Sequence, residues 1–436
     1  MTRAASLVVA LVFAAPGFAQ PVNLTEKVGL GDKTKCTVDL ELKGNLFVVQ
    51  AGKKESIRLE AKARHVFAER VLTAIDGLPN STARHYDEAT ATALVASEKT
   101  NRTLPADRKF VVARRNPDGL FCFAPAGPLS REELDLVTEH FNPQCLAGLL
   151  PGKAVNVGDT WTIADAACQA ACLFDAVGKN QLVGKFTAVK DGVATFTIDG
   201  NAEGIESGAK VTLAVNATGT FDTTAGRVTE LSWKQKDERE QGPVNPASQV
   251  EATVTLKREL LAALPKELSD EVVAKVPEGD VPAAMTELRH ADAKGRYSMV
   301  HVRDWHVTGQ TDTHLVLRLM DKGEFVAQAT VSVWQKVAAG KHTTPDDFKR
   351  AIADAPGWTP SKVLTDGELP ATPGRYLYRL TAEGKMDDLP VIQTFYLLAG
   401  AQGDQVAVTL AMKPDKVKAV GTRDATLVNA IEFGKK

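Results

Sequence analysis

The sequence predicts an α+β protein rich in β-strands. We expect an N-terminal antiparallel β domain with a few helices, followed by a C-terminal domain of α/β/α type around a second antiparallel sheet. Segments in which apolar and polar residues alternate recur from residue 34 onward, as in half-buried strands. A charged stretch broken by Pro265, Pro277 and Pro282 interrupts this alternation. The predicted division is therefore 20–258 for the first domain, 259–291 for a linker and 292–436 for the second domain.

The first residues have the layout of a secretory signal peptide. Arg3 is followed by the apolar run 4–15 and by Gly17-Phe18-Ala19, a small-x-small cleavage site. An uncleaved anchor is the alternative, but this run is shorter than the ~20 residues that span a bilayer. We therefore predict a signal peptide over 1–19, cleaved after Ala19, and a secreted or periplasmic protein with no membrane span in its mature chain.

Charge and motifs exclude several classes of function. The chain has 52 Lys and Arg against 54 Asp and Glu, so no bulk positive field attracts nucleic acid. The Gly-x-Ser-x-Gly, His-Glu-x-x-His and glycine-rich phosphate-loop patterns do not occur in the sequence. We accordingly predict no catalytic residues, no metal ligands and no cofactor.

The cysteines leave two interpretations open. Cys168 and Cys172 are four residues apart on one face of an expected helix over 165–177. They are either a redox or metal-binding pair or, as we prefer, two small buried side chains. An odd total leaves at least one thiol unpaired, and the sequence does not determine how they pair. The five are Cys36, Cys122, Cys145, Cys168 and Cys172.

Strands dominate the predicted first domain. Cys36, Val38, Leu40 and Leu42 alternate with polar residues, and a capping box at Ser130 begins a helix. A meander of strands joined by short turns favours an antiparallel sheet. The mixed charges of 234–240 are interpreted as a solvated extension of one strand. Strands are expected at 34–42, 57–63, 109–114, 120–123, 182–189, 193–198, 209–221, 227–235 and 249–257.

The clearest local structure of the second domain is a β-hairpin. Strands over 391–398 and 405–412 flank a glycine-containing turn, and their apolar residues fall on both faces. This predicts that layers cover both sides of the hairpin. Thr344 caps a helix, and a final helix over 414–430 is broken at Gly421. Further strands are expected at 297–304, 314–320, 325–333 and 374–382, giving the order β-β-β-α-β-β-β-α.

This second domain resembles the PsbP-like superfamily. The resemblance rests on residues 295–305, 325–331, the helix with Phe348, 376–378, 393–397 and the terminal helix. That superfamily includes extrinsic subunits of photosystems, a nuclear factor that binds the Ran GTPase and small bacterial envelope proteins. The resemblance implies docking on larger assemblies rather than catalysis, and many members have a proline where this chain has Asp304 before Trp305. The whole chain also resembles uncharacterised secreted bacterial proteins with two such parts, which implies no activity.

The most site-like segment is 301–306. On a strand, His301, Arg303 and Trp305 share one face, so these three are our candidate binding residues. A general base with its orienting group, or a metal site completed by His314, is the catalytic alternative. A strand end with a buried tryptophan and locally paired polar residues is the interpretation we favour.

Three functional hypotheses follow. The leading one is an exported, non-catalytic binding or scaffold protein that docks on an unknown envelope protein through its C-terminal domain. The second is a carrier of an apolar small molecule, bound in a cavity of the N-terminal domain lined by Val211, Leu213, Val215 and Leu231. The third is a hydrolase-type enzyme centred on His301 and His306.

Overall fold

The structure is a computed structural model that describes residues 20–434 apart from 51, 117–118, 139–140 and 354–356. The predicted signal peptide over 1–19 lies outside the described residues. Strands hold 57% of the chain and helices 15%, which confirms the prediction of a β-rich α+β protein. None of the helices that the structure describes is long and apolar enough to cross a bilayer.

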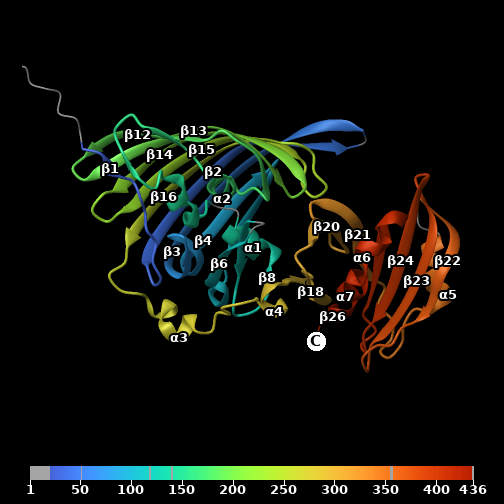
Figure 1. Cartoon of the computed structure of the whole chain (residues 1–436). Helices are drawn as coiled ribbons and strands as arrows, with labels where there is room; N and C mark the ends of the chain where they lie inside the picture. The colour runs from blue at the N-terminus through green and yellow to red at the C-terminus, as the bar shows by residue number, and fades with distance from the viewer. Residues whose placement is uncertain (1–19, 51, 117–118, 139–140, 354–356, 435–436) are drawn as a thin grey trace, which may run out of the picture.

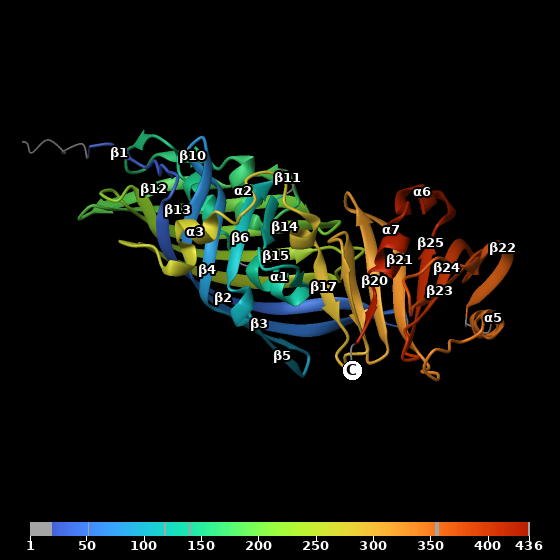
Figure 2. The same cartoon turned by 90° about the horizontal axis from the view of Figure 1, so that it is seen from below.

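A strongly curved antiparallel sheet of 13 strands forms the N-terminal part (Figures 1 and 2). Its strands follow the order β10-β12-β13-β14-β15-β16-β2-β3-β4-β6-β7, and β5 and β11 pair at its sides. Strand β2 lies mid-sheet, with Thr34 opposite Leu260 of β16 on one side and Glu69 of β3 on the other. The strands are β2 (Lys33–Gln50), β3 (Lys53–Ile75), β4 (Leu78–Val95), β5 (Glu98–Thr103), β6 (Phe110–Asn116), β7 (Gly119–Phe123), β10 (Thr160–Thr162), β11 (Ala176–Asn180), β12 (Val183–Lys190), β13 (Val193–Glu206), β14 (Ala209–Asp222), β15 (Arg227–Arg239) and β16 (Ala247–Leu260).

The concave face of this sheet wraps around a set of short helical segments, which we call the plug (residues 131–138, 141–149 and 165–172) (Figure 1). The plug contains α1 (Arg131–Thr138), the 3-10 turn η2 (Pro143–Leu149) and α2 (Asp165–Cys172). Its leucines and alanines join the concave side chains in one core. The capping box is confirmed, because the Glu133 amide donates to Ser130 Oγ and the Ser130 amide donates to Glu133 Oε2.

Buried polar groups fasten the plug to the sheet. Arg84 donates to Glu69 Oε2 at 2.7 Å and to Asn142 Oδ1 at 2.7 Å, and Gln144 Nε2 donates to Thr82 Oγ1 at 3.0 Å. A buried ion pair is weak evidence for net stability, but its directional bonds fix one arrangement of the parts that it joins. This network therefore specifies where the plug sits on the concave face.

Residues between the two large sheets pack on the first one. The 3-10 turn η3 (Lys266–Leu268) places Leu268 against Ala68 and Ala83 on the outer face, and it is followed by α3 (Asp270–Val273) and α4 (Ala283–Thr286). A four-stranded sheet of order β26-β18-β17-β8 then joins the two parts of the chain. Its strands are β8 (Leu129–Ser130), β17 (Leu288–Ala291), β18 (Tyr297–His301) and β26 (Glu432–Phe433), and a separate pair joins β1 (Val22–Asn23) to β9 (Ala154–Val155).

The C-terminal part is a seven-stranded antiparallel sheet between helices (Figure 1). Helix α5 (Pro345–Ala353) packs through Phe348 and Ile352 on one face, and α7 (Arg423–Asn429) packs through Leu427 and Val428 on the other. The short α6 (Val417–Val420) precedes Gly421, whose φ of 57° confirms the predicted break. The strands, in sheet order, are β19 (Trp305–Gln310), β20 (His314–Asp321), β21 (Glu324–Trp334), β25 (Gln405–Met412), β24 (Leu389–Ala399), β23 (Tyr376–Met386) and β22 (Trp358–Glu368); the 3-10 turn η4 (Pro414–Lys416) follows β25.

The predicted hairpin is confirmed as β24 and β25, with Ala399 opposite Gln405. Its two faces lie in different cores: Phe395 and Leu397 contact the α5 side, whereas Tyr396 and Leu398 contact the side of α6 and α7. A hairpin that is apolar on both faces is thus covered on both faces.

Several element boundaries differ from the predictions. The strand expected over 297–304 ends at His301, because the chain turns before Trp305 begins β19. The helix with the two cysteines ends at Cys172, since Leu173 adopts a left-handed conformation with φ of 58°. Strands β4, β5 and β22 were not predicted, and β3 is much longer than the predicted segment 57–63.

Candidate functional site

A cavity of about 460 Å³ lies between the concave face of the N-terminal sheet and the plug. It occupies the part of the hollow that the plug leaves uncovered, beneath the ends of β2, β3, β4, β15 and β16. Small-molecule sites in proteins have volumes of about 300–1,000 Å³. The hollow therefore has the size of a ligand site.

The wall formed by the sheet is apolar and partly uncovered. Leu40 and Leu42 of β2 and Leu59 of β3 line the cavity and are only half-buried. Alanines on β3, β4 and β16 make room beside them, whereas Phe67, Tyr86 and Trp233 fill the other end of the same concave face. The cavity thus begins where the side chains on the concave face become small. The alanines are Ala61, Ala63, Ala91, Ala93 and Ala252.

The plug supplies the opposite wall. Leu136 of α1 and Phe141 line the cavity from one side, and Cys172 at the end of α2 lines it from another. His65 Nε2 lies 2.8 Å from the Leu136 carbonyl oxygen and so ties α1 to β3. Burial lowers the pKa of His65 to about 4, so the imidazole is neutral near pH 7.

One end of the cavity is polar. Gln235, Asp237 and Arg239 point into it from β15, and Arg239 lies 3.2 Å from Glu206 of β13. Burial, together with the nearby Glu206 carboxylate, raises the pKa of Asp237 to about 6. The cavity therefore combines an apolar body with a polar end that includes a destabilised carboxylate.

The loops at this polar end touch the C-terminal sheet. Arg318 of β20 donates to the carbonyl oxygen of Pro243, in the loop between β15 and β16. Gly208, in the turn between β13 and β14, packs so closely on Gly323 that a Cβ there would lie 2.5 Å from the Gly323 carbonyl oxygen. The polar end of the cavity and the C-terminal sheet are thus in direct contact.

The three predicted binding residues lie at the junction of the two parts. Trp305 is fully buried in the C-terminal core, and His301 is buried at the end of β18 with Nδ1 at 3.0 Å from the Val302 carbonyl oxygen. Arg303, in the turn between them, donates to the carbonyl oxygens of Cys122 and Thr286 at 2.6 Å each. The turn separates these residues from the single strand face on which they were predicted.

Arg303 also stacks on Phe121, with the guanidinium carbon 4.4 Å from the ring centroid. Burial lowers the pKa of Arg303 to about 10, which keeps the side chain charged at neutral pH. Because its donors reach main-chain oxygens of β7 and α4, Arg303 ties the start of the C-terminal part to the N-terminal sheet and to the segment that follows it.

The two histidines of the enzyme hypothesis both lie beside Arg131. Arg131 Nη2 is 3.2 Å from His306 Nδ1, and its positive charge also acts on His301. Burial, together with the charge of Arg131 and the neighbouring His301, lowers the pKa of His306 to about 4. Both imidazoles are therefore neutral near pH 7. Nδ1 of His306 faces the Arg131 guanidinium, and Nδ1 of His301 faces the carbonyl oxygen of Val302.

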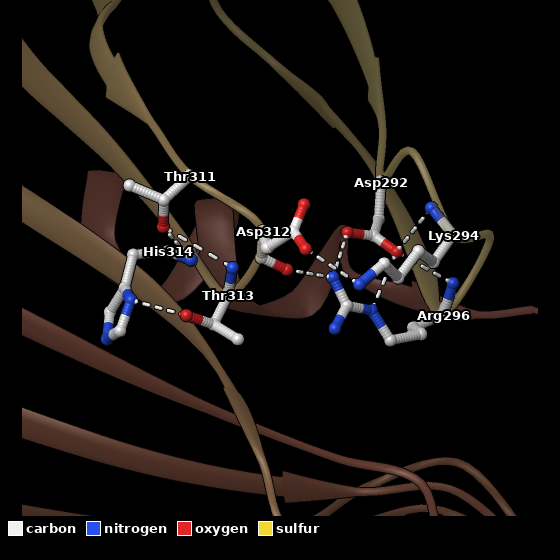
Figure 3. Close-up of polar contacts among 7 residues, drawn as sticks. All are labelled: Asp292, Lys294, Arg296, Thr311, Asp312, Thr313 and His314. Atoms are coloured by element: carbon white, nitrogen blue, oxygen red, sulfur yellow. Dashed lines mark hydrogen bonds and ion pairs between the residues drawn. The ribbon is translucent and has the colours of Figure 1, made fainter.

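His314, the third predicted metal ligand, lies at the other end of the β19–β20 hairpin. There its Nδ1 is 2.8 Å from Thr313 Oγ1, as Figure 3 shows. The neighbouring turn is held by Asp292, which accepts from Arg296 Nε at 2.8 Å, while Lys294 Nζ lies 2.8 Å from Asp312 (Figure 3). This cluster is a set of mutually paired surface charges that joins two turns.

The cysteines are buried thiols. All five are free and buried, and burial raises the pKa of Cys36, Cys122 and Cys145. Cys168 and Cys172 both lie on α2, one helical turn apart as their spacing predicts, and a hydrogen bond between them lowers the pKa of Cys168 and raises that of Cys172. Across the part of the chain that the structure describes, no three His, Cys, Asp or Glu residues are arranged to hold a metal ion.

A cavity is present in the N-terminal part, as hypothesised, but its walls are largely different from those predicted. Of the four predicted lining residues only Val211 lines it, whereas Leu213, Val215 and Leu231 are buried in the packed core. Residues 234–240 are only half solvated: alternate residues of β15 face the hollow. Asp237 was missed for this reason, and the continued alternation after Trp233 was the signal that could have revealed it.

Parts of this chain are similar to solved structures that include PsbP and Mog1 proteins, the group that the sequence resemblance names. This chain is similar to cyanobacterial PsbP (CyanoP) from Synechocystis sp. PCC 6803, with 16% identity over 36% of this chain and 99% of that one and a TM-score of 0.27. It is similar to the Ran-binding protein Mog1p of Saccharomyces cerevisiae, with 13% identity over 34% of this chain and 95% of that one and a TM-score of 0.27. Lipovitellin is 7% identical over 55% of this chain and 26% of that one, with a TM-score of 0.31.

No protein-family model and no curated protein sequence matches the chain. At these identities and TM-scores, the structural likenesses concern the fold and carry no conclusion about activity or ligand.

Proposed function

We propose that this is a non-catalytic binding protein that carries an apolar molecule in the cavity under its N-terminal sheet. The observation that carries the proposal is the hollow of about 460 Å³ between the concave face and the plug. Half-buried leucines at 40, 42 and 59 line it. Removing such surface from water is favourable, at roughly 25 cal/mol per Å², so an apolar occupant would be stabilised there.

The position of the small side chains supports carriage. The cavity wall is rich in alanine on β3 and β4, while aromatic residues fill the concave face only a few residues away. A sheet that served only as a structural core would gain stability from larger side chains at these positions. The catalytic alternative has weaker support, because His301 and His306 are buried and neutral beside Arg131.

A cavity-filling variant tests the proposal. Ala61→Phe places a ring in the hollow, and we expect it to abolish binding of the neutral fluorescent probe N-phenyl-1-naphthylamine, which the native protein should bind with enhanced emission. Ala214→Phe is the matched control, since Ala214 is exposed on the outer face of β14 in the same sheet. Absence of probe binding to the native protein, or equal binding by both variants, would count against carriage.

Docking on a protein through the C-terminal sheet is the second candidate. The edge strand β22 is open, with Val363 57% exposed and Leu364 40% exposed. Such an edge offers unpaired backbone groups and apolar side chains to a partner strand, although Pro360 interrupts part of it. The candidate partner is an exported envelope protein.

Charge substitutions on this edge test docking. We expect the double variant Val363→Lys with Leu364→Lys to lose a partner that the native chain captures from an envelope extract. Leu30→Lys, which changes an exposed leucine of the N-terminal part, should retain it. Capture that is the same for all three proteins would argue against this edge as the docking site.

Export and the division into two domains are part of the proposal. The signal peptide predicts that protein recovered from the producing cells begins at Gln20, which N-terminal sequencing checks. The predicted boundaries 20–258 and 292–436 are tested by limited proteolysis, which should release fragments cut between these ranges.

A further inference from the structure

Strand β15 carries a row of polar side chains into an otherwise apolar hollow. Gln235, Asp237 and Arg239 line the cavity, while Lys236 and Glu238 between them face the outer solvent. Alternation along a strand sends successive side chains to opposite faces. The three polar side chains therefore lie on the concave face of the sheet, at one end of the cavity.

A chain of hydrogen bonds along this row ends at a free acceptor. Trp233 Nε1 donates to Gln235 Oε1 at 2.7 Å, and Gln235 Nε2 donates to Asp237 Oδ2 at 3.0 Å. Asp237 Oδ1 is buried and has no hydrogen-bond partner among the residues that the structure describes. A buried acceptor without a donor is unfavourable, so this oxygen would be stabilised by a group that donates to it.

The cationic side chains around the cavity are already engaged. Arg239 pairs with Glu206 at 3.2 Å and donates to the Pro246 carbonyl oxygen at 3.3 Å. Arg102 faces Asp135 at 3.8 Å. This leaves the carboxylate of Asp237 as the charge that the cavity compensates least, and burial accordingly raises its pKa to about 6.

We infer that the cavity selects amphiphiles whose head group donates hydrogen bonds and bears no negative charge, a protonated amine above all, and that Asp237 receives this head group. The inference rests on the proposed carriage function and specifies the class of ligand. The apolar body of the ligand lies along Leu40, Leu42 and Leu59, and its head donates to Asp237 Oδ1. An anionic head, such as the carboxylate of a fatty acid, is repelled by Asp237 and Glu206.

Three ligands with the same chain length but different heads test the inference. Dodecylamine, dodecanol and dodecanoate are each used at pH 7.5 to displace N-phenyl-1-naphthylamine from the full mature chain. For the native protein we expect dodecylamine to bind at least about tenfold more tightly than dodecanoate, with dodecanol between them. The amine would form a buried charge-assisted hydrogen bond with Asp237, whereas the carboxylate of dodecanoate would be repelled by it.

The variant Asp237→Asn keeps the shape of the side chain and removes its charge. We expect it to lose most of the preference for dodecylamine over dodecanoate while still binding the neutral probe. Glu238→Gln is the matched control, because it removes one negative charge from the neighbouring residue on the outer face and should leave the preference unchanged.

Thermal unfolding of the ligand-free proteins separates a ligand-binding role from a structural one. Removal of a poorly compensated buried charge should raise the melting temperature of Asp237→Asn above that of the native protein. A lower melting temperature would mean that Asp237 serves to hold β15 in place, and would overturn the inference.

The outcomes distinguish this inference from the function on which it rests. If the native protein binds neither the probe nor any of the three ligands, carriage itself fails. If it binds dodecanoate as tightly as dodecylamine, or if Asp237→Asn keeps the preference, carriage stands and the selection by Asp237 is wrong.

Discussion

The two large sheets of this protein use antiparallel strands in opposite ways. In the C-terminal sheet the central hairpin is buried on both faces, and helices cover each side. In the N-terminal sheet the plug covers only part of the concave face, so that Leu40, Leu42 and Leu59 remain half-buried around a cavity. A filled sheet supports a rigid body, whereas a partly uncovered one keeps apolar surface available for a ligand.

The largest expected effect comes from the filled sheet. Leu397→Ala removes a fully buried side chain from the contact between β24 and α5, and we expect it to lower the free energy of unfolding by about 2–5 kcal/mol. Urea denaturation followed by near-ultraviolet circular dichroism measures this loss. A loss below about 1 kcal/mol would mean that the C-terminal core is loosely packed and that the contrast between the sheets is wrong.

Acidification should weaken the junction between the two parts. The pKa of His306 is about 4 in the folded protein against an ordinary value of 6.5, so between these values only the unfolded chain binds the proton. Stability that is complete above about pH 6.5 is therefore lost as the pH falls towards 4, by on the order of 1–3 kcal/mol for this group.

The variant His306→Asn retains an acceptor for Arg131 and cannot titrate in this range. We expect a smaller loss of stability between pH 7 and pH 4.5 than in the native protein, measured by urea denaturation at each pH. Some dependence should remain, since burial also lowers the pKa of His65 and His301. An unchanged slope would show that His306 does not contribute.

Alanine substitutions at two glycines test the contact between the N-terminal and C-terminal sheets. Gly208 and Gly226 both have positive φ angles, of 78° and 65°, so alanine costs about 1 kcal/mol at each. Only at Gly208 would the new Cβ also meet the Gly323 carbonyl oxygen, whereas a Cβ at Gly226 would point into open space. We expect Gly208→Ala to lower the melting temperature more than Gly226→Ala, and equal shifts would argue against a close contact of the two turns.

The smallest expected effect comes from the cavity wall. Leu42→Ala removes a half-buried side chain that already borders empty space, so we expect a loss of stability below about 1 kcal/mol together with clearly weaker binding of the neutral probe. Chemical denaturation and a fluorescence titration measure the two quantities. A loss of stability as large as that of Leu397→Ala would mean that Leu42 belongs to a packed core.

The fold was predictable where its signals are local. The hairpin of β24 and β25 combines a glycine-containing turn with apolar residues on both faces, and the structure confirms each of these features. The break in the final helix at Gly421 and the capping box at Ser130 depend only on neighbouring residues, and both are likewise confirmed. Strand β22 has no such signal, because only Trp358 is buried along it and its pairing depends on β23.

The candidate site was less predictable, because distant segments define it. Leu213 of β14 and Asp237 of β15 lie opposite each other and so face the same side of the sheet. Alternation along the two strands does not show that Leu213 is covered by the core while Asp237 reaches an open hollow. That difference depends on where the plug ends. Arg303 also gains its role at a distance, since its donors reach the carbonyl oxygen of Cys122.

The central position of β2 has a consequence for how the chain folds as it is synthesised. Strand β2 is made early, and β3 can pair with it at once, but its other edge must wait for β16, where Leu260 finally lies opposite Thr34. Contacts between residues so far apart in sequence form slowly. Until they form, a strand of 18 residues presents an open edge, which is a surface prone to aggregation. A chaperone that covers this edge would therefore be needed most before residue 260 is made.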